Sequence, residues 1–365
     1  MPADLDVPAE LAPVRAAVAR ALEAVAERCG RQLASDLAPV NQLCEHVEAY
    51  RGKMLRPSLV MLAYLAARPG AGPEPLPDAV FRLGAVCELV HMATLVHDDV
   101  LDEADIRRKG LTVNRLHGNE AAVVLGDYLF SAAYHLCAAL PGPAGRRAAR
   151  LVARTGMSLC AGELLQLHHR HDLRLDEAMY LRVVSRKTAS LIAAACRLGA
   201  LGAAPAPRPE ARAAAARLAR FGRRLGVAFQ IQDDLLDLTG AESAVGKPVN
   251  RDLALGKLTL PVIHHLRAAT PARRAASVAL IRQVMSAPRP AEPPAEGPAG
   301  ARAAEDPRVA GELRAALEAT GSIAYARGRA AQLVDMARAE LEPLPPSPAK
   351  SFLGVIAAAV INRSS

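Results

Sequence analysis

The sequence predicts an all-α fold in which residues 1–365 form a single-domain helical bundle. Apolar residues recur at helical spacing along stretches rich in Ala, Leu, Arg and Glu, which favour helix. No segment alternates apolar and polar residues between Asn-Gly-type turns, as a strand hairpin would. Because 51% of the 365 residues are hydrophobic, such a bundle can bury a large core.

Proline- and glycine-rich breaks divide the chain into its expected helices. The first are 9–29, 34–49 and 55–67, and RPGAGPEPLP separates them from 77–104. Helix 117–139 ends at PGPAG before 143–168, and 175–201 ends at APAPRPE before 208–239. The remaining helices are 258–268, 271–285, 307–319, 322–342 and 347–362. The longest irregular segment, 286–307, is expected to be a flexible surface loop rather than a domain linker.

Composition excludes several classes of protein. The net charge is +8, but aromatic residues make up only 3% of the chain and do not alternate with the basic ones, so nucleic acid is not the expected partner. Six scattered cysteines without a CxxC pair argue against disulfides and structural zinc. The acidic, proline-broken N-terminus is not a signal peptide, and no uninterrupted apolar run reaches the ~20 residues of a membrane span. We therefore expect a cytoplasmic protein.

The lysines point to phosphate chemistry. Only six of the 45 basic residues are Lys, so each is a departure from the chain's preference for Arg. A compact ammonium group and a planar guanidinium bind anions differently. Four of the six, Lys53, Lys187, Lys247 and Lys257, lie in the short motifs GKMLRP, RKTASL and GKPVNRDLALGKLTLP.

An acidic cluster ends the apolar helix 77–104. In HDDVLDE, Asp98 and Asp102 are four residues apart and share a helix face, where like charges repel. A solvated helix end and a metal site are both compatible with this cluster alone. The preceding stripe ELVHMATLVH is apolar, however, and charges that emerge from a buried stripe need a counter-charge.

A second cluster repeats the DDxxD pattern. In FQIQDDLLD, Asp233, Asp234 and Asp237 again follow an apolar helical run. Two carboxylate clusters facing a common cavity would suit Mg²⁺, which is usually bound together with substrate phosphates. No His/Cys set has the spacing of a zinc site. With the nearby lysines and arginines, the pattern predicts a site for Mg²⁺ and two diphosphates.

These motifs, in this order and spacing, resemble those of the trans-type isoprenyl diphosphate synthases, the polyprenyl synthetase family. The similarity runs from GKMLRP through HDDVLDEADIRRKG, GDYLF, GELLQL, KTASL, FQIQDDLLD and GKPVNRDLALGKLTLP to TGSIAYARGRAAQLVDMA, nearly the whole chain. It implies an isoprenoid synthase fold, a helical bundle around a deep central cavity, usually as a homodimer. It also implies head-to-tail condensation of isopentenyl diphosphate with geranyl, farnesyl or geranylgeranyl diphosphate. The implied cofactor is Mg²⁺, about three ions per site, with Mn²⁺ as a substitute.

The resemblance assigns roles to individual residues. The Mg²⁺ ligands would be Asp98, Asp102, Asp233 and Asp237, and the catalytic clusters are completed by Asp99 and Asp234. The isopentenyl diphosphate site would comprise Lys53, Arg56, His91 and Arg108. Contacts to the allylic diphosphate and its reacting end would come from Arg107, Lys187, Thr188, Gln230, Lys247 and Lys257. The chain departs from the family at Met54, often a cation, and at Asn250-Arg251, where Gly with a polar residue is common.

Product length should depend on the helix that bears Asp98. Short-chain members usually place Phe or Tyr about one turn before the first Asp, but this chain has Ala93 and Thr94 there. The path upstream would be lined by Val90, Cys87 and Val86, and a floor could come from Tyr134, Leu136, Cys137 or Val152. The pattern therefore favours products longer than C20, of medium- or long-chain type.

Several alternatives remain at this stage. The chain could be a short-chain (C15 or C20) synthase, a class I terpene cyclase, a head-to-head synthase or a subunit of a heteromeric synthase. A cyclase would normally lack the second DDxxD and the cations of the isopentenyl diphosphate site, and a non-catalytic subunit would usually have lost the acidic clusters. His168, His169 and His171 of LHHRHD are interpreted as loop residues.

Overall fold

The computed structural model describes residues 7–48, 50–68, 70, 75–108, 110–202, 206–239, 251–286 and 307–361. Helices dominate these ranges, as predicted. The chain divides into two compact units, of which unit 1 comprises residues 1–159, 188–226 and 336–359 and unit 2 comprises 160–187, 227–335 and 360–365. The single domain stays a prediction. Lys247 and most of the expected loop 286–307 lie outside the described residues; Ser286 and Pro307 belong to helices.

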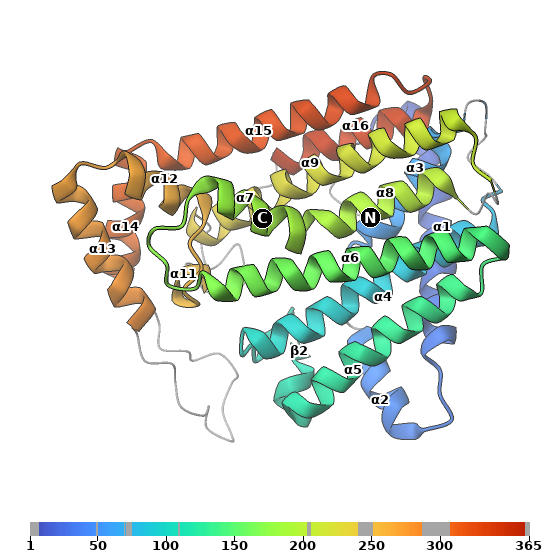
Figure 1. Ribbon diagram of the computed structural model, residues 1–365, viewed down its shortest axis with the longest axis horizontal. Helices are drawn as coiled ribbons and strands as arrows, with labels where there is room; N and C mark the ends of the chain where they lie inside the picture. Colours follow the sequence, from blue (N-terminus) through green and yellow to red (C-terminus); the bar gives the residue numbers. More distant parts are fainter. Residues whose placement is uncertain are drawn as a thin grey trace. The chain divides into compact units, whose positions relative to one another are not determined.

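Unit 1 is built around α4 (Asp78–Leu101), which packs against α1 (Ala12–Leu33), α3 (Leu55–Ala66), α5 (Val113–Ala138) and α8 (Ala189–Leu201) (Figure 1). A short 3-10 helix, Ala9–Leu11, precedes α1, and α2 (Ala38–Glu48) packs on α5. Because α4 has neighbours on several sides, its own buried residues run from Val80 to Asp99 and occur on every face of the helix.

Unit 2 contains α7 (Glu177–Lys187), α11 (Arg251–Ala254), α12 (Leu260–Ala268), α13 (Pro271–Ser286) and α14 (Pro307–Ala319). Within it, α12 packs against α7, α13 and α14. The fully buried His265 of α12 bonds Ser277 Oγ at 2.8 Å and Thr320 Oγ1 at 2.9 Å, so its ring nitrogens are satisfied. Four helices contribute residues to both units: α6 (Gly142–His168), α9 (Pro209–Thr239), α15 (Ser322–Leu341) and α16 (Pro348–Ile361).

Three local features differ from the sequence-based expectation. The expected helix 175–201 is interrupted at Thr188, which separates α7 from α8. The expected helix 77–104 ends at Leu101, and a two-stranded antiparallel hairpin follows, with β1 (Ile106–Arg107) paired to β2 (Gly110–Leu111). The prediction that His168 lies in a loop was wrong, because it is the last residue of α6.

Two described helices are long and apolar enough to cross a membrane by length and composition, α4 with a mean hydropathy of 1.6 and α5 with 1.3. The core helices of soluble proteins meet the same criterion. The two helices pack against each other within unit 1, and the charged Glu88 interrupts the apolar run of α4. Burial accounts for the composition of α4, since 67% of its apolar window is buried, whereas 44% of the window of α5 is buried.

Candidate active site

The first acidic motif lies where α4 ends. Asp98 is in the last turn, and Asp102 caps the C-terminus, with its N–H donating to the Asp98 carbonyl oxygen at 2.9 Å. Because this bond has the helical i to i+4 pattern, the two side chains share one face. Both carboxylates are half-buried and partly accessible to solvent.

The middle residue of this motif has a different environment. Asp99 is only 2% exposed, and its carboxylate accepts hydrogen bonds from Arg107 Nε at 2.8 Å and Arg107 Nη2 at 2.6 Å. Arg107 lies on β1 of the hairpin, and its guanidinium is also within 5.9 Å of the Tyr50 ring centre. The Tyr50 hydroxyl accepts a bond from the Val113 N–H at 3.0 Å. Asp99 therefore anchors the hairpin to the end of α4.

The structure brings together three of the four residues predicted to hold isopentenyl diphosphate. Burial lowers the pKa of His91 well below its usual value, and the positive charges of Arg56, Arg107 and Arg108 add to the effect. These guanidiniums come from α3 and the hairpin, whereas His91 is on α4. Lys53 lies on the exposed turn before α3. A neutral imidazole can donate one N–H without repelling the neighbouring arginines.

A buried carboxylate supports this cation cluster. Glu88, one turn before His91, is 2% exposed; burial raises its pKa, and attraction to Arg56, Arg51 and Arg108 opposes the rise. Arg108 also donates to the Arg51 carbonyl oxygen. Its guanidinium lies against Gly52, so that an added Cβ there would displace it.

In the second acidic motif, as in the first, the middle aspartate is buried and the outer two are half-buried. Asp234 is 4% exposed, and burial and the nearby charge of Asp252 raise its pKa well above the usual value. The Tyr180 hydroxyl of α7 donates to Asp234 Oδ2 at 2.6 Å, and Gln230 Nε2 donates to Oδ1 at 2.8 Å. The Gln230 amide nitrogen therefore faces Asp234, and its amide oxygen is not used in this bond.

Asp237 organises the segment that follows the motif. Its carboxylate accepts the backbone N–H groups of Arg251 at 3.2 Å and Asp252 at 3.1 Å, at the start of α11. The Lys257 N–H in turn donates to the Asp252 carbonyl oxygen at 2.8 Å. The carboxylate of Asp237 thus holds the start of α11, and a backbone bond to Asp252 ties the half-buried Lys257 to the same turn.

Lys187 is held at the end of α7 by the motif GELLQL of α6. Its ammonium pairs with Glu163 and donates to Gln166 Oε1 at 2.9 Å. The next residue, Thr188, is half-buried and starts α8. Glu163 and Gln166 limit the positions available to Lys187.

The residues predicted to control product length lie on two packed helices of unit 1. Val90 and Ala93 of α4 and Cys137 of α5 are fully buried, and Leu136 is 5% exposed. Thr94 is half-buried, and its hydroxyl donates to the His91 carbonyl oxygen at 2.7 Å. None of the five side chains is aromatic.

The carboxylate chemistry fits Mg²⁺. Hard oxygen donors that are half-buried and partly accessible are supplied by Asp98, Asp102, Asp233 and Asp237. Across the described ranges, no three or more His, Cys, Asp or Glu side chains gather as a ready-made metal cage. Mg²⁺ commonly uses one or two carboxylates and completes its shell with waters and substrate phosphates. The donors therefore suit an ion bound jointly with a diphosphate.

Sequence reasoning missed several residues that support the site. Glu88 attracts the arginines of unit 1, and the Tyr50 ring lies near the Arg107 guanidinium. Tyr180 donates a hydrogen bond to Asp234 of the second acidic motif. The position of Glu88 within the apolar run of α4 was a signal that could have identified it. The sequence carries no comparable signal for Tyr180, which is far from Asp234 along the chain.

Replacing Tyr180 with Phe will test the support of the second motif. We expect the free energy of unfolding to fall by about 1–2 kcal/mol, because buried Asp234 loses a donor. We expect kcat to fall about tenfold through the displaced Gln230 amide, since each ~1.4 kcal/mol corresponds to a factor of ten. Urea unfolding measures the stability, and steady-state assays measure kcat. The matched control is Tyr64→Phe, because the Tyr64 ring packs under the Arg68 guanidinium rather than against an acidic motif. An unchanged kcat at reduced stability would make Tyr180 purely structural.

Comparison with known proteins identifies a family and several similar chains. Residues 38–290 match the family model described as Polyprenyl synthetase. The chain is 41% identical over 245 residues to the heptaprenyl diphosphate synthase component 2 of Geobacillus stearothermophilus, covering 67% of this chain and 72% of that protein. It is 33% identical over 332 residues to the octaprenyl diphosphate synthase of Escherichia coli (strain K12), covering 91% and 92%.

Solved structures confirm the all-α fold class. A decaprenyl diphosphate synthase from Rhodobacter capsulatus aligns with a TM-score of 0.80 at 31% identity, covering 97% of this chain and 99% of that one. A polyprenyl synthase from Caulobacter crescentus, complexed with calcium and isoprenyl diphosphate, gives a TM-score of 0.81 at 28% identity, covering 97% and 98%.

Proposed function

We propose that this chain, which belongs to the polyprenyl synthetase family and is a prenyltransferase, condenses isopentenyl diphosphate head-to-tail with an allylic diphosphate to give an all-trans product longer than C20. The observation that carries the proposal lies within unit 1, where Arg107 of the hairpin bonds Asp99, next to Asp98 at the end of α4. The guanidiniums of Arg56 and Arg108 add positive charge near His91 of the same helix. A reaction between two diphosphates needs such carboxylates and cations together. The relatives named octaprenyl, nonaprenyl and heptaprenyl diphosphate synthases support the product class.

In this mechanism the side chains bind, orient and shield the substrates. Arg56, Arg108 and Lys53 hold isopentenyl diphosphate, while Lys187 and Lys257 hold the allylic diphosphate. Preorganised positive charge stabilises the negative charge that develops as pyrophosphate leaves. The Thr188 hydroxyl and the Gln230 amide oxygen support the electron-poor allylic carbon, and the departing pyrophosphate takes the proton. When bound, Mg²⁺ would supply Lewis-acid charge at the leaving group.

A product assay tests the function directly. The purified chain is incubated with Mg²⁺, farnesyl diphosphate and labelled isopentenyl diphosphate, and the dephosphorylated products are sized. We expect a ladder that ends at C30 or beyond. A stop at C15 or C20 would retain the chemistry and refute the product class. A folded chain that extends no primer would contradict the synthase assignment for the chain alone.

Introducing Phe at Ala93 should shorten the product. The new ring would fill the proposed path between α4 and α5, where Val90 and Cys137 are also buried. Overpacking costs about 1–3 kcal/mol, so Thr94→Phe at a half-buried position provides a second, better tolerated variant. Product sizing and thermal melting are measured together, with Ala79→Phe at the start of α4 as the control. Full-length product from both folded variants would sink this placement of the path.

We also propose a homodimer located in the cytoplasm and using Mg²⁺. Support for self-association is an apolar stripe on α6, where Met157 is 73% exposed, Leu164 is 66% exposed and Cys160 is exposed between them. Exposed apolar stripes at helical spacing are typical of contact surfaces. A second copy is the proposed occupant; the relatives named component 2 favour a heteromeric partner as the alternative.

Light scattering distinguishes these assemblies. We expect the purified chain to have twice its 38.4 kDa mass and Met157→Asp to shift it towards the monomer. Met336→Asp, which changes an exposed Met on α15, should leave the mass unchanged. A monomeric wild-type chain that gains activity only with a second polypeptide would favour the heteromeric alternative.

A further inference from the structure

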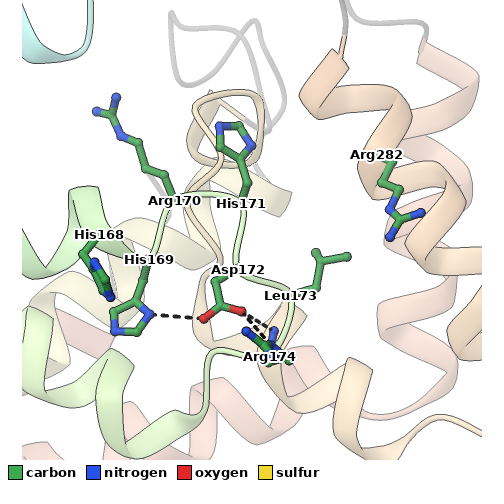
Figure 2. A pocket seen from close by; sticks show the side chains of 8 residues that line it. All are labelled: His168, His169, Arg170, His171, Asp172, Leu173, Arg174 and Arg282. Carbon is green, nitrogen blue, oxygen red and sulfur yellow. Dashed lines mark hydrogen bonds and ion pairs between the residues drawn. The ribbon is translucent and has the colours of Figure 1, made fainter.

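The turn that follows α6 forms a basic hollow within unit 2. Its cavity of about 550 Å³ is lined by the three histidines of LHHRHD and by Arg170, Arg174 and Arg282 (Figure 2). Arg282 comes from α13, whereas the other basic residues belong to the end of α6 and its turn. Asp172 is the single carboxylate among the described lining residues.

That carboxylate is already engaged. Asp172 accepts the Arg174 backbone N–H at 3.0 Å and the Arg174 Nε at 3.5 Å, and lies 3.2 Å from His169 Nδ1 (Figure 2). These contacts, led by the backbone N–H, hold the pKa of Asp172 below its usual value. The lining residues therefore carry three guanidiniums and three imidazoles but one carboxylate, so hydrogen-bond donors for an anion outnumber acidic groups in the hollow.

The turn is also fixed in shape. His171 has a left-handed backbone (φ 62°), and its N–H donates to the Gly256 carbonyl oxygen at 2.8 Å. Its ring packs against Gly256, where an added Cβ would come within 2.5 Å of the imidazole and where φ is also positive. A strained conformation maintained by such contacts is typical of binding sites. The hollow is therefore preformed, and it adjoins the segment that continues into Lys257.

We propose that this hollow binds a phosphate or diphosphate anion. Planar guanidiniums bind phosphate oxygens in pairs, and imidazole N–H groups donate to the same oxygens. Two sources supply this chemistry: inorganic pyrophosphate in solution, or the phosphate of a lipid headgroup. A nearby release of pyrophosphate depends on the proposed prenyl transfer. The proposed anion site does not depend on it.

Two exposed arginines on α13 provide a matched test. Arg282→Gln removes a lining guanidinium, whereas Arg273→Gln removes an equivalent charge outside the hollow. Binding of inorganic pyrophosphate is measured by equilibrium dialysis in EDTA, and binding to phosphatidylglycerol vesicles by flotation against phosphatidylcholine vesicles. We expect Arg282→Gln to weaken one class of pyrophosphate site about tenfold, the effect of one charge-assisted bond, and Arg273→Gln to have no effect.

Each outcome decides the proposal. A selective loss of pyrophosphate binding in Arg282→Gln supports the site with a soluble anion. A selective loss of vesicle binding alone supports it with a lipid phosphate. Equal behaviour of the two variants in both assays overturns it. Prenyl transfer is assayed in parallel and should be unchanged in both variants; failure of the wild-type chain to make product would refute the proposed function without altering the binding comparison.

Discussion

Changing Asp98 to Asn will lower kcat about a thousandfold, an effect of the size found when a key electrostatic group is removed from an active site. Asn keeps the shape of Asp98 but removes the charge through which, in our proposal, the end of α4 engages Mg²⁺ and diphosphate. Stability should change by no more than a few tenths of a kcal/mol, because the variant relieves the repulsion between Asp98 and Asp102 but also loses the attraction of Asp98 to Arg107.

Asp105→Asn is the control for this result. It lies in the same acidic segment but pairs loosely with Arg115, 3.9 Å away, and should retain nearly full kcat. The measurement is steady-state turnover over a range of Mg²⁺ concentrations, together with urea unfolding without metal. Equal losses of activity in Asp98→Asn and Asp105→Asn would show a general charge effect and contradict the role of Asp98.

Asp99→Asn should act in the opposite sense on stability. Asp99 is 2% exposed and Arg107 24%, and removing one partner leaves the guanidinium without its counter-charge. Breaking such a buried pair lowers the free energy of unfolding by about 3 kcal/mol. Activity should also fall, because the hairpin carrying Arg107 and Arg108 loses its anchor on α4.

The control for Asp99→Asn is the exposed pair of α14. Glu312→Gln breaks its ion pair with Arg308, where the side chains are 48% and 82% exposed, and should change stability by less than about 0.5 kcal/mol. The double variant Asp99→Leu/Arg107→Met should be more stable than Asp99→Asn, because no buried charge is left unmatched. If Asp99→Asn unfolds like the wild type and instead raises the Mg²⁺ requirement, Asp99 is a metal ligand and the anchor role is wrong.

The helical fold could be predicted because most of its information is local. Apolar spacing located α4, α9 and α13 to within a few residues, and proline and glycine marked the main breaks. The same spacing predicted that Asp98 and Asp102 share a face. What local patterns could not reveal was which aspartate is buried, since all three residues of each DDxxD look alike in sequence.

The remaining features depend on contacts distant in sequence. Tyr180 meets Asp234 across 54 residues, and Asp237 accepts the Arg251 N–H across 14 residues, so neither bond has a periodic signature. The break at Thr188 occurs within a run that favours helix throughout, so local propensity could not locate it. The hairpin is too short for an alternating pattern, although it is the element that carries Arg107.

The pairing of each middle aspartate with its own partner has an evolutionary consequence. Asp99 should covary with Arg107, and Asp234 with Tyr180 or Gln230, because selection there acts on a matched pair within the fold. The outer aspartates should instead be lost together when a lineage abandons the chemistry. In the first motif the acids would thus record two separate histories, one of folding at Asp99 and one of catalysis at Asp98 and Asp102. Asp237 of the second motif would record both, because it also holds the start of α11.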